Sequence, residues 1–265
     1  MSQALQADPA VIVPDNADIQ SSTASVSSSI LQYRRENGRT YHAYKDGNLQ
    51  HNLFLLTLND KLGLAPPNET GAKVKHVLDV GTGTGIWAID YADEHPEAQP
   101  FDYIHSRFMT SSIANWTDYL TKCFNNLAPG GYIELQECDL SIRSDDGTLS
   151  PDNIMLKSLA LLMEASIKFG RPYQDIPALA DVMAKIGFVD FVVEMFKWPI
   201  NSWPKDKKAK LLGSWCHANF SIGLEAFTMA PLTRAHNWTP EEVSLFLVDQ
   251  RKTMSDKNTH AYWPM

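Results

Sequence analysis

The spacing of apolar positions along the chain changes several times, and each change predicts an element. An apolar run at Val77–Val80 predicts a strand, and the amphipathic stretch Ile86–Ala92 predicts the helix that follows it. The next apolar run, Phe101–Ile104, predicts a second strand. From Ser112 to Leu127 apolar residues recur at helical spacing, which predicts a helix laid on a sheet, and the strand Tyr132–Gln136 follows. Strands and helices therefore alternate in this part of the chain.

The second half of the chain has a mostly helical pattern. We predict helices at 154–169, 175–186 and 209–227, and a strand at Phe188–Phe196. The run Thr239-Pro240-Glu241-Glu242 predicts the start of a further helix, with threonine at the cap, proline in the first turn and glutamate three residues on. This last helix is expected to end near Thr253.

The most informative local feature is the turn after the first strand, where Asp79 precedes Gly81-Thr82-Gly83-Thr84-Gly85. Glycines let the backbone approach a ligand and tolerate positive φ, and the N-terminus of the next helix faces the same point. The dinucleotide fingerprint needs glycine or alanine at its sixth position, where this chain has Ile86, so a nicotinamide oxidoreductase fits poorly. The structural alternative is a turn that only joins a strand to a helix.

Three runs together are more specific than the turn alone: Asp79–Asp90, Phe101–Arg107 and Asn126–Glu137. They resemble fungal methyltransferases of the LaeA-like group, which are class I S-adenosylmethionine-dependent methyltransferases. That group is associated with secondary metabolism, either as regulators or as members of biosynthetic gene clusters. The segments Glu36–Tyr44 and His260–Pro264 are similar to it as well. The resemblance therefore extends from about Tyr33 to the last residue.

The resemblance implies an α/β fold, a Rossmann-like sheet with flanking helices, and S-adenosyl-L-methionine as the cofactor. In this family the glycine turn lies against the methionine part of the cofactor. The candidate cofactor-binding residues are Asp79, Gly81, Thr82, Gly83, Gly85 and His105. Methyl transfer uses an activated methyl group and mainly needs an aligned nucleophile, so no catalytic residue is assigned. His105 is the best candidate base by position and type.

Part of the family's sheet is missing from this sequence. Class I methyltransferases have two more strands and two more helices between the strands that correspond to Val77–Val80 and Phe101–Ile104. Here the helix after Gly85 leaves only Pro96–Pro100 as a linker, and a parallel crossover needs at least ~10–12 residues. We therefore predict a sheet without the usual second and third strands. The acidic residues that face the cofactor's ribose and adenine have no equivalent, since Asp102 stands at the start of its strand rather than at its carboxyl end.

The missing segment also creates a conflict over strand order. Parallel crossovers are right-handed in ~98% of cases, which favours placing Phe101–Ile104 where the family's second strand lies. Its sequence instead matches the fourth strand, on the other side of Val77–Val80. A second block is absent after Gly47, and family members continue beyond Met265 into a final strand. Several clean losses with intact flanks indicate altered exon usage or a mispredicted gene model more than gradual drift.

Composition limits the partners that this chain can have. Its formal net charge of −8, with Lys205–Lys210 as the only basic run, argues against binding to nucleic acid. It has no apolar stretch of ~18 residues and no signal-peptide pattern, so we expect no membrane association and an intracellular location, in the cytoplasm or nucleus. We expect one domain over residues 31–265 and a serine-rich, disordered tail over 1–30. The three cysteines and eight histidines form no metal-binding pattern.

Two functional hypotheses follow. The first is a methyltransferase that acts on a small-molecule methyl acceptor, and the second is a catalytically silent scaffold or regulator that binds a protein partner. Affinity for the cofactor discriminates between them. Glu137 and Asp139 follow the strand Tyr132–Gln136 and form either an exposed acidic loop or part of a substrate site. His217 is expected to be a packed helix residue rather than a base.

Overall fold

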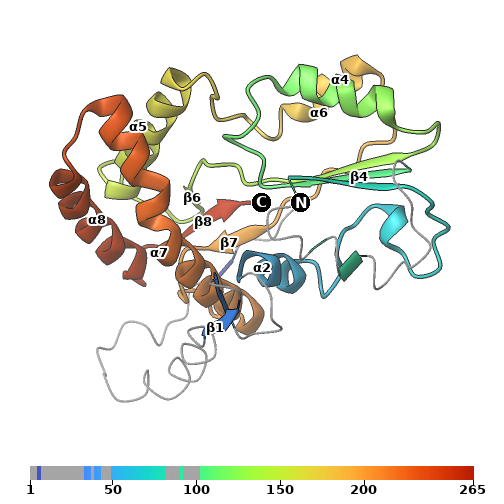
Figure 1. The fold of residues 1–265 in the computed structure, drawn as a ribbon. Coiled ribbons are helices and arrows are strands. Elements are labelled where there is room, and N and C mark those ends of the chain that lie inside the picture. The colour runs from blue at the N-terminus through green and yellow to red at the C-terminus, as the bar shows by residue number, and fades with distance from the viewer. Residues whose placement is uncertain are drawn as a thin grey trace.

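The fold is known from a computed structural model, which describes residues 5–6, 33–36, 39–42, 49–81, 87, 90–91 and 102–265. The predicted tail over residues 1–30 lies outside this part of the chain, apart from Leu5 and Gln6. Figure 1 shows two regions, a parallel sheet with its helices and a mostly helical region around a small antiparallel sheet. Before them, β1 (Tyr33–Glu36) and β2 (Arg39–His42) form an antiparallel pair.

The parallel-sheet region confirms the first predicted strands. β3 (Val77–Val80), β4 (Tyr103–Arg107) and β5 (Tyr132–Gln136) run parallel in the order β3-β4-β5. The helices α4 (Trp116–Asn126) and α6 (Leu179–Ile186) cover one face, and α2 (Leu49–Thr57) lies on the other (Figure 1). A short 3-10 helix, η3 (Pro66–Asn68), follows α2. The sheet is thus flanked by helices on both faces, as predicted.

The described residues of the two connections between these parallel strands lie on opposite faces of the sheet. Trp87 and Tyr91, which lie between β3 and β4 in the sequence, pack with Tyr103 on the face toward α2. Helix α4, which connects β4 to β5, packs on the other face against Ile133 and Leu135. Both connections step in the same direction across the sheet, so they have opposite hands and one of them has the rare left hand. β4 therefore keeps the place that its sequence indicates, beside β5, against the handedness preference.

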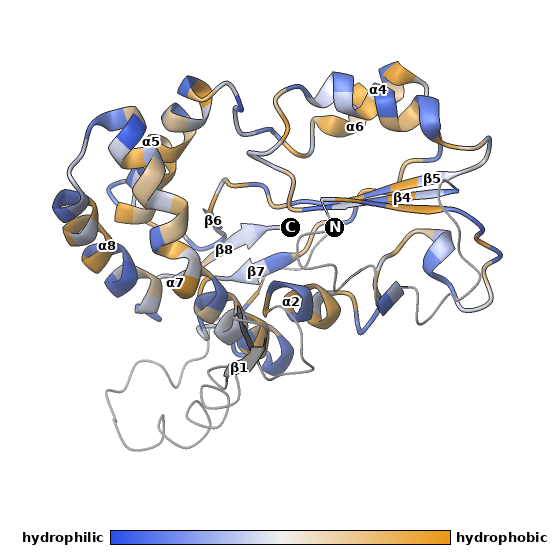
Figure 2. Ribbon diagram, in the orientation of Figure 1, coloured by the Kyte–Doolittle hydropathy of each residue, from blue (hydrophilic) through white to orange (hydrophobic). Residues whose placement is uncertain are grey.

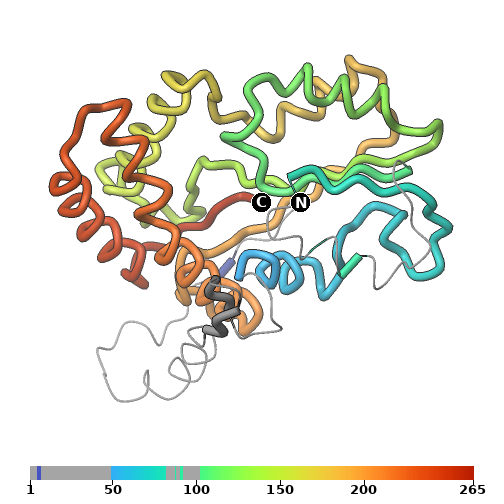
Figure 3. The backbone as a smooth tube through the Cα atoms, viewed as in Figure 1, coloured from blue at the N-terminus to red at the C-terminus, as the bar shows by residue number. Residues whose placement is uncertain are grey.

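The second region, called the cap region here, contains an antiparallel sheet and three helices. Its strands β6 (Arg143–Ser144), β7 (Lys197–Pro199) and β8 (Ala261–Pro264) lie in the order β6-β8-β7. Figure 3 shows the C-terminal strand, in red, returning to pair with segments far from it in the sequence. The helices are α5 (Ile154–Lys168), α7 (Lys207–His236) and α8 (Pro240–Ser255).

An apolar core holds the cap region together. Figure 2 shows hydrophobic and hydrophilic residues side by side on α5, α7 and α8, and the hydrophobic ones supply buried residues such as Leu232 and Leu247. Helix α7 is longer than predicted, because it continues through Pro231 and brings Leu232 into the core. The predicted start of α8 is confirmed, since Thr239 and Glu242 form a reciprocal capping box.

The predicted strand at Phe188–Phe196 is wrong for most of its length. Residues 189–195 form no strand, and Val189, Val192 and Val193 are exposed. Only Phe196 is paired, through backbone hydrogen bonds with Met265 in both directions. Valine-rich sequence favours extended backbone, but a strand also needs a neighbour with which to pair, and no described strand lies along residues 189–195.

The described residues show no sign of a membrane span or of a metal site. No helix among them is long and apolar enough to cross a membrane. They contain no group of three or more histidine, cysteine or acidic side chains placed to hold a metal ion. Cys123, Cys138 and Cys216 are buried free thiols.

Candidate functional site

The carboxyl ends of β3, β4 and β5 meet at one edge of the sheet, because the three strands run in the same direction. β3 ends at Val80, and Gly81 follows with a φ of +77°, a conformation that glycine adopts without strain. A Cβ added at Gly81 would lie 2.5 Å from Sδ of Met109, so the loop after β4 packs closely on the first glycine of the turn. This edge is where open parallel sheets bind their ligands.

Of the predicted cofactor-binding residues, the structure brings two into direct contact. Asp79 and His105 face each other on neighbouring strands, and Nδ1 of His105 lies 2.8 Å from Oδ1 of Asp79. Gly81 stands at the carboxyl edge next to them. The other three, Thr82, Gly83 and Gly85, lie outside the described residues. The cofactor-binding roles of all six stay predictions.

His105 is buried within β4 instead of being exposed at its end. The ring of Trp87 stacks on the imidazole, with 3.6 Å between centroids and 4° between planes. If Nδ1 donates to Asp79, Nε2 is an acceptor, and it is buried without a hydrogen-bond partner among the described residues. Burial lowers the pKa of His105, so the ring is neutral at pH 7. In this arrangement His105 is an oriented, packed group, whereas a general base must reach the proton that it removes.

A buried polar network lies on the face of the sheet toward α2, and sequence analysis missed it. Nε of Arg107 donates to Oε1 of Gln136 at 2.7 Å, and Nε2 of Gln136 donates to Oε1 of Glu134 at 2.8 Å. Glu134 also accepts the hydroxyl of Tyr103 at 2.9 Å and the backbone N–H of Ala65 at 2.9 Å. A signal was present, since Glu134 and Gln136 alternate along β5 and must share one face.

Glu137 is buried at the carboxyl end of β5 and holds the loop after β4. Its carboxylate oxygens accept the backbone N–H groups of Met109 at 2.8 Å and Thr110 at 3.0 Å. Phe108 and Ser111 in this loop have φ values of 55° and 63°, which are strained for residues other than glycine. Burial raises the pKa of Glu137 to about 7, although the two N–H bonds oppose the shift. Of the two alternatives for Glu137, the exposed acidic loop is therefore wrong, because this side chain is buried and positions the loop after β4.

The other residues that the sequence analysis singled out have structural roles. Asp102 accepts the backbone N–H groups of Lys75 and His76, each at 3.0 Å, at the amino end of β4, as its place at the start of the strand predicted. His217 is half-buried on α7, which confirms it as a packed helix residue. Asp139 forms an ion pair of 2.7 Å with Arg143 at the start of β6.

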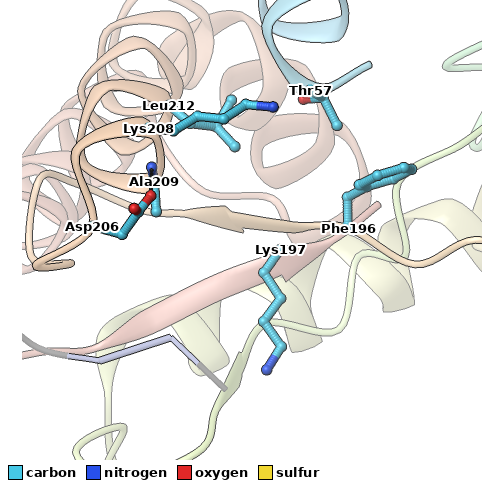
Figure 4. A pocket seen from close by; sticks show the side chains of 7 residues that line it. All are labelled: Thr57, Phe196, Lys197, Asp206, Lys208, Ala209 and Leu212. Atoms are coloured by element: carbon cyan, nitrogen blue, oxygen red, sulfur yellow. Dashed lines mark hydrogen bonds between the residues drawn. The ribbon is translucent and has the colours of Figure 1, made fainter. Parts of the chain in front are cut away.

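A cavity of about 170 Å³ lies between the end of α2, β7 and the start of α7 (Figure 4). Its lining residues are Thr57, Phe196, Lys197, Asp206, Lys208, Ala209 and Leu212. None of the predicted cofactor-binding residues lines it, and ligand pockets are usually ~300–1,000 Å³. This cavity is therefore not the candidate site.

A parallel sheet with helices on both faces and a glycine turn after its first strand defines the Rossmann-like class I methyltransferase fold. Residues 88–192 match a family model described as a methyltransferase domain. Comparison with known proteins makes the assignment more specific. The chain is 35% identical to "Methyltransferase pytC" of Aspergillus terreus over 92% of its own length and 89% of that protein.

Two further relatives come from other fungi. The chain is 31% identical to "Probable methyltransferase tdiE" of Emericella nidulans, over 82% of its length and 78% of that protein. It is 30% identical to "Secondary metabolism regulator LAE1" of Cochliobolus heterostrophus, over 86% of its length and 91% of that protein. The chain therefore belongs to the LaeA-like methyltransferase family of fungal secondary metabolism.

The same comparison confirms the internal deletion. The alignment with the Aspergillus terreus protein extends over 292 positions, which is more than the 265 residues of this chain. The relative therefore carries internal residues that have no counterpart here. Among the described residues the parallel sheet has the three strands β3, β4 and β5, with no further strand beside β3, as the sequence predicted.

Proposed function

We propose that this protein is an S-adenosylmethionine-dependent methyltransferase that acts on a small molecule in fungal secondary metabolism. Its family implies a methyl donor and a small-molecule methyl acceptor. The observation that carries the proposal is its 35% identity, over nearly the whole of both chains, to a protein named as a methyltransferase. The glycine turn that begins at Gly81, at the carboxyl edge of the parallel sheet, supports it.

The described residues fit the methionine end of this cofactor better than its nucleoside end. Gly81 has the positive φ that lets backbone approach a ligand, and Asp79 lies at the end of the same strand. For the ribose hydroxyls the usual partner is an acidic residue at the end of the next strand. Here the next strand is β4, and its acidic residue, Asp102, is bonded at the opposite end to Lys75 and His76.

The cofactor, when bound, supplies an activated methyl group, and the chain has to align the acceptor with it. The loop after β4 is placed for this task, since Met109 packs on Gly81. Glu137 holds that loop by two backbone hydrogen bonds, so the position of the loop depends on one buried carboxylate. His105 is oriented by Asp79 and shielded by Trp87, so it contributes packing beneath this edge of the sheet.

An intracellular location, in the cytoplasm or nucleus, belongs to the same proposal. Free cysteine thiols are typical of reducing compartments, whereas disulfides are typical of secreted proteins. The buried free thiols of Cys123, Cys138 and Cys216 support this location.

Isothermal titration of the monodisperse protein with S-adenosylmethionine tests the proposal. We expect saturable binding by the natural sequence and at least about tenfold weaker binding by Gly83→Asp, because a charged side chain blocks close approach to the turn. The matched control is Gly71→Asp, which adds the same charge at an exposed glycine with φ +83° and open space around it. Absence of binding by the folded natural sequence would overturn the proposal.

The second candidate function is a catalytically silent scaffold or regulator with a protein partner. The absence of a ribose partner at the described carboxyl edge favours it, and so does the engagement of the Asp79 carboxylate by His105. A relative at 30% identity is named as a regulator of secondary metabolism. The titration separates the two, since a scaffold does not need the cofactor. A chain that is unfolded in solution would instead support a faulty gene model.

A further inference from the structure

Arg107 is the last residue of β4 and stands level with the first glycine of the turn. The parallel register pairs Val80 with Ser106, so Gly81 and Arg107, the residues that follow, lie side by side at the carboxyl edge. The guanidinium lies on the face toward α2, 4.3 Å from the centre of the Phe54 ring. The strand position beside Gly81 is therefore held by a cationic residue whose side chain packs on α2.

Neutral groups hold this cation in place. Nε of Arg107 donates to Gln136 at 2.7 Å, and Nη1 donates to Nδ1 of His51 at 3.0 Å. Because arginine has no acceptor, Nδ1 of His51 must be unprotonated, so Nε2 of His51 carries the proton and donates to Asp90 at 2.9 Å. The guanidinium is thus oriented before any ligand binds, which lowers the entropic cost of binding.

The positive charge of Arg107 has no direct anionic partner in the described part of the chain. No carboxylate there lies within ion-pair distance of the guanidinium, and Nη2 is buried without a hydrogen-bond partner. Burial lowers the pKa of Arg107 to about 10, so it stays charged at pH 7. A buried, charged donor that is left unsatisfied is costly, and an anion that accepts from it recovers that cost.

We propose that Arg107 binds the carboxylate of the methionine moiety of S-adenosylmethionine through Nη2. This inference rests on the proposed function, because it takes that cofactor as the ligand. The turn at Gly81 receives the methionine end, and the carboxylate is the anionic group of that end. The residue that carries the cation and the free donor is therefore the register neighbour of the first glycine of the turn.

The test removes the carboxylate from the ligand and the guanidinium from the protein. Calorimetry compares S-adenosylhomocysteine with its decarboxylated analogue, which keeps the amine, the sulfur and the nucleoside. We expect the natural sequence to prefer the carboxylate ligand about 10- to 100-fold, as is typical of a charge-assisted hydrogen bond. In Arg107→Met this preference disappears while affinity for the analogue is unchanged. Arg107→Lys, which keeps the charge, retains part of the preference.

Arg143→Met is the matched control, because Arg143 is an exposed arginine of β6 that pairs with Asp139. It should keep the full preference. If the natural sequence binds both ligands equally, the inference is overturned, and this result does not need a folded Arg107→Met variant. A preference for the carboxylate ligand that survives in Arg107→Met also overturns it. Either result leaves the proposed function standing. If the folded natural sequence binds neither ligand, the proposed function and the inference are both removed.

Discussion

The cap region and the parallel-sheet region bury different kinds of side chain. The core of the cap region is apolar, with Ile200, Leu232 and Leu247 at most 1% exposed. Beneath the parallel sheet, the face toward α2 combines an apolar cluster around Trp87 and Tyr103 with a connected polar network that includes Gln136 and Arg107. Apolar contacts are non-directional, whereas a buried polar network has to be satisfied as a whole. The cap region should therefore respond to changes of volume, and the parallel-sheet region to changes of charge.

The predicted loss of two strands falls in the parallel-sheet region. Among the described residues β4 is the next strand in the chain after β3, and one of the two connections in this sheet has the rare hand. The cap region keeps its three paired strands and its continuous core. The largest apolar core and the part that would bind the cofactor are thus different, so loss of cofactor binding need not mean loss of folding.

Truncation of a core leucine should give the largest loss of stability, and it changes the packing of the cap region alone. Leu247→Ala, at a residue 1% exposed, should lower the free energy of unfolding by about 2–5 kcal/mol, because it leaves a cavity in the apolar core. Leu245→Ala makes the same change on the same helix at a residue 71% exposed and should cost less than about 0.5 kcal/mol. Urea unfolding measures both, and equal losses would show that the cap region is not a packed core.

A change of charge at Glu137 should give the next largest effect and acts in the parallel-sheet region. The folded pKa of Glu137, about 7, is above the ordinary value of 4.5. The stability that its protonated carboxyl group contributes to the fold is therefore fully present below pH 4.5 and is lost as the pH rises through 7. A shift of this size corresponds to roughly 3 kcal/mol. Glu137→Gln removes the titration, so the natural sequence should lose stability relative to this variant between pH 5 and pH 8.

Urea unfolding of both proteins at the two pH values measures this difference. Burial lowers the pKa values of His51 and His105, so these residues stabilise the fold as the pH rises through 6.5. Both histidines are present in both proteins, and their effect cancels in the comparison. Glu137→Asp keeps a carboxyl group and should keep the pH dependence. Parallel pH profiles of Glu137→Gln and the natural sequence would contradict the assignment.

Sequence periodicity predicted elements whose burial pattern is local. Trp116, Leu120 and Cys123 are buried at helical spacing, so α4 was found within a few residues of its ends. Pairing between strands leaves no such local signal, which is why the valine-rich segment at residues 189–195 was mistaken for a strand. Helix α7 was predicted too short, because Leu232 and its partners in the core are distant in the sequence.

The residues of the candidate site were likewise predictable only where their pattern is local in the sequence. Asp79 and Gly81 were predicted because they belong to one continuous run with a known spacing. The bonds from Arg107 to His51 and from Thr110 to Glu137 join residues 56 and 27 positions apart, so no local pattern indicates them. Their geometry depends on the strand order, which the sequence left in conflict.

The smallest effects should come from two helix caps, one in each region, and they sharpen the contrast between the cores. Thr239 accepts the N–H of Glu242 at 3.2 Å at the start of α8, and Asn115 accepts the N–H of Asp118 at 3.1 Å at the start of α4. Capping bonds are local, so Thr239→Ala and Asn115→Ala should each cost about 1 kcal/mol in urea unfolding at pH 7. Because the two costs are alike, the difference between the regions would lie in their buried faces and not in their helices. A gap of more than about 1 kcal/mol between the two variants would place part of the difference in the helix starts.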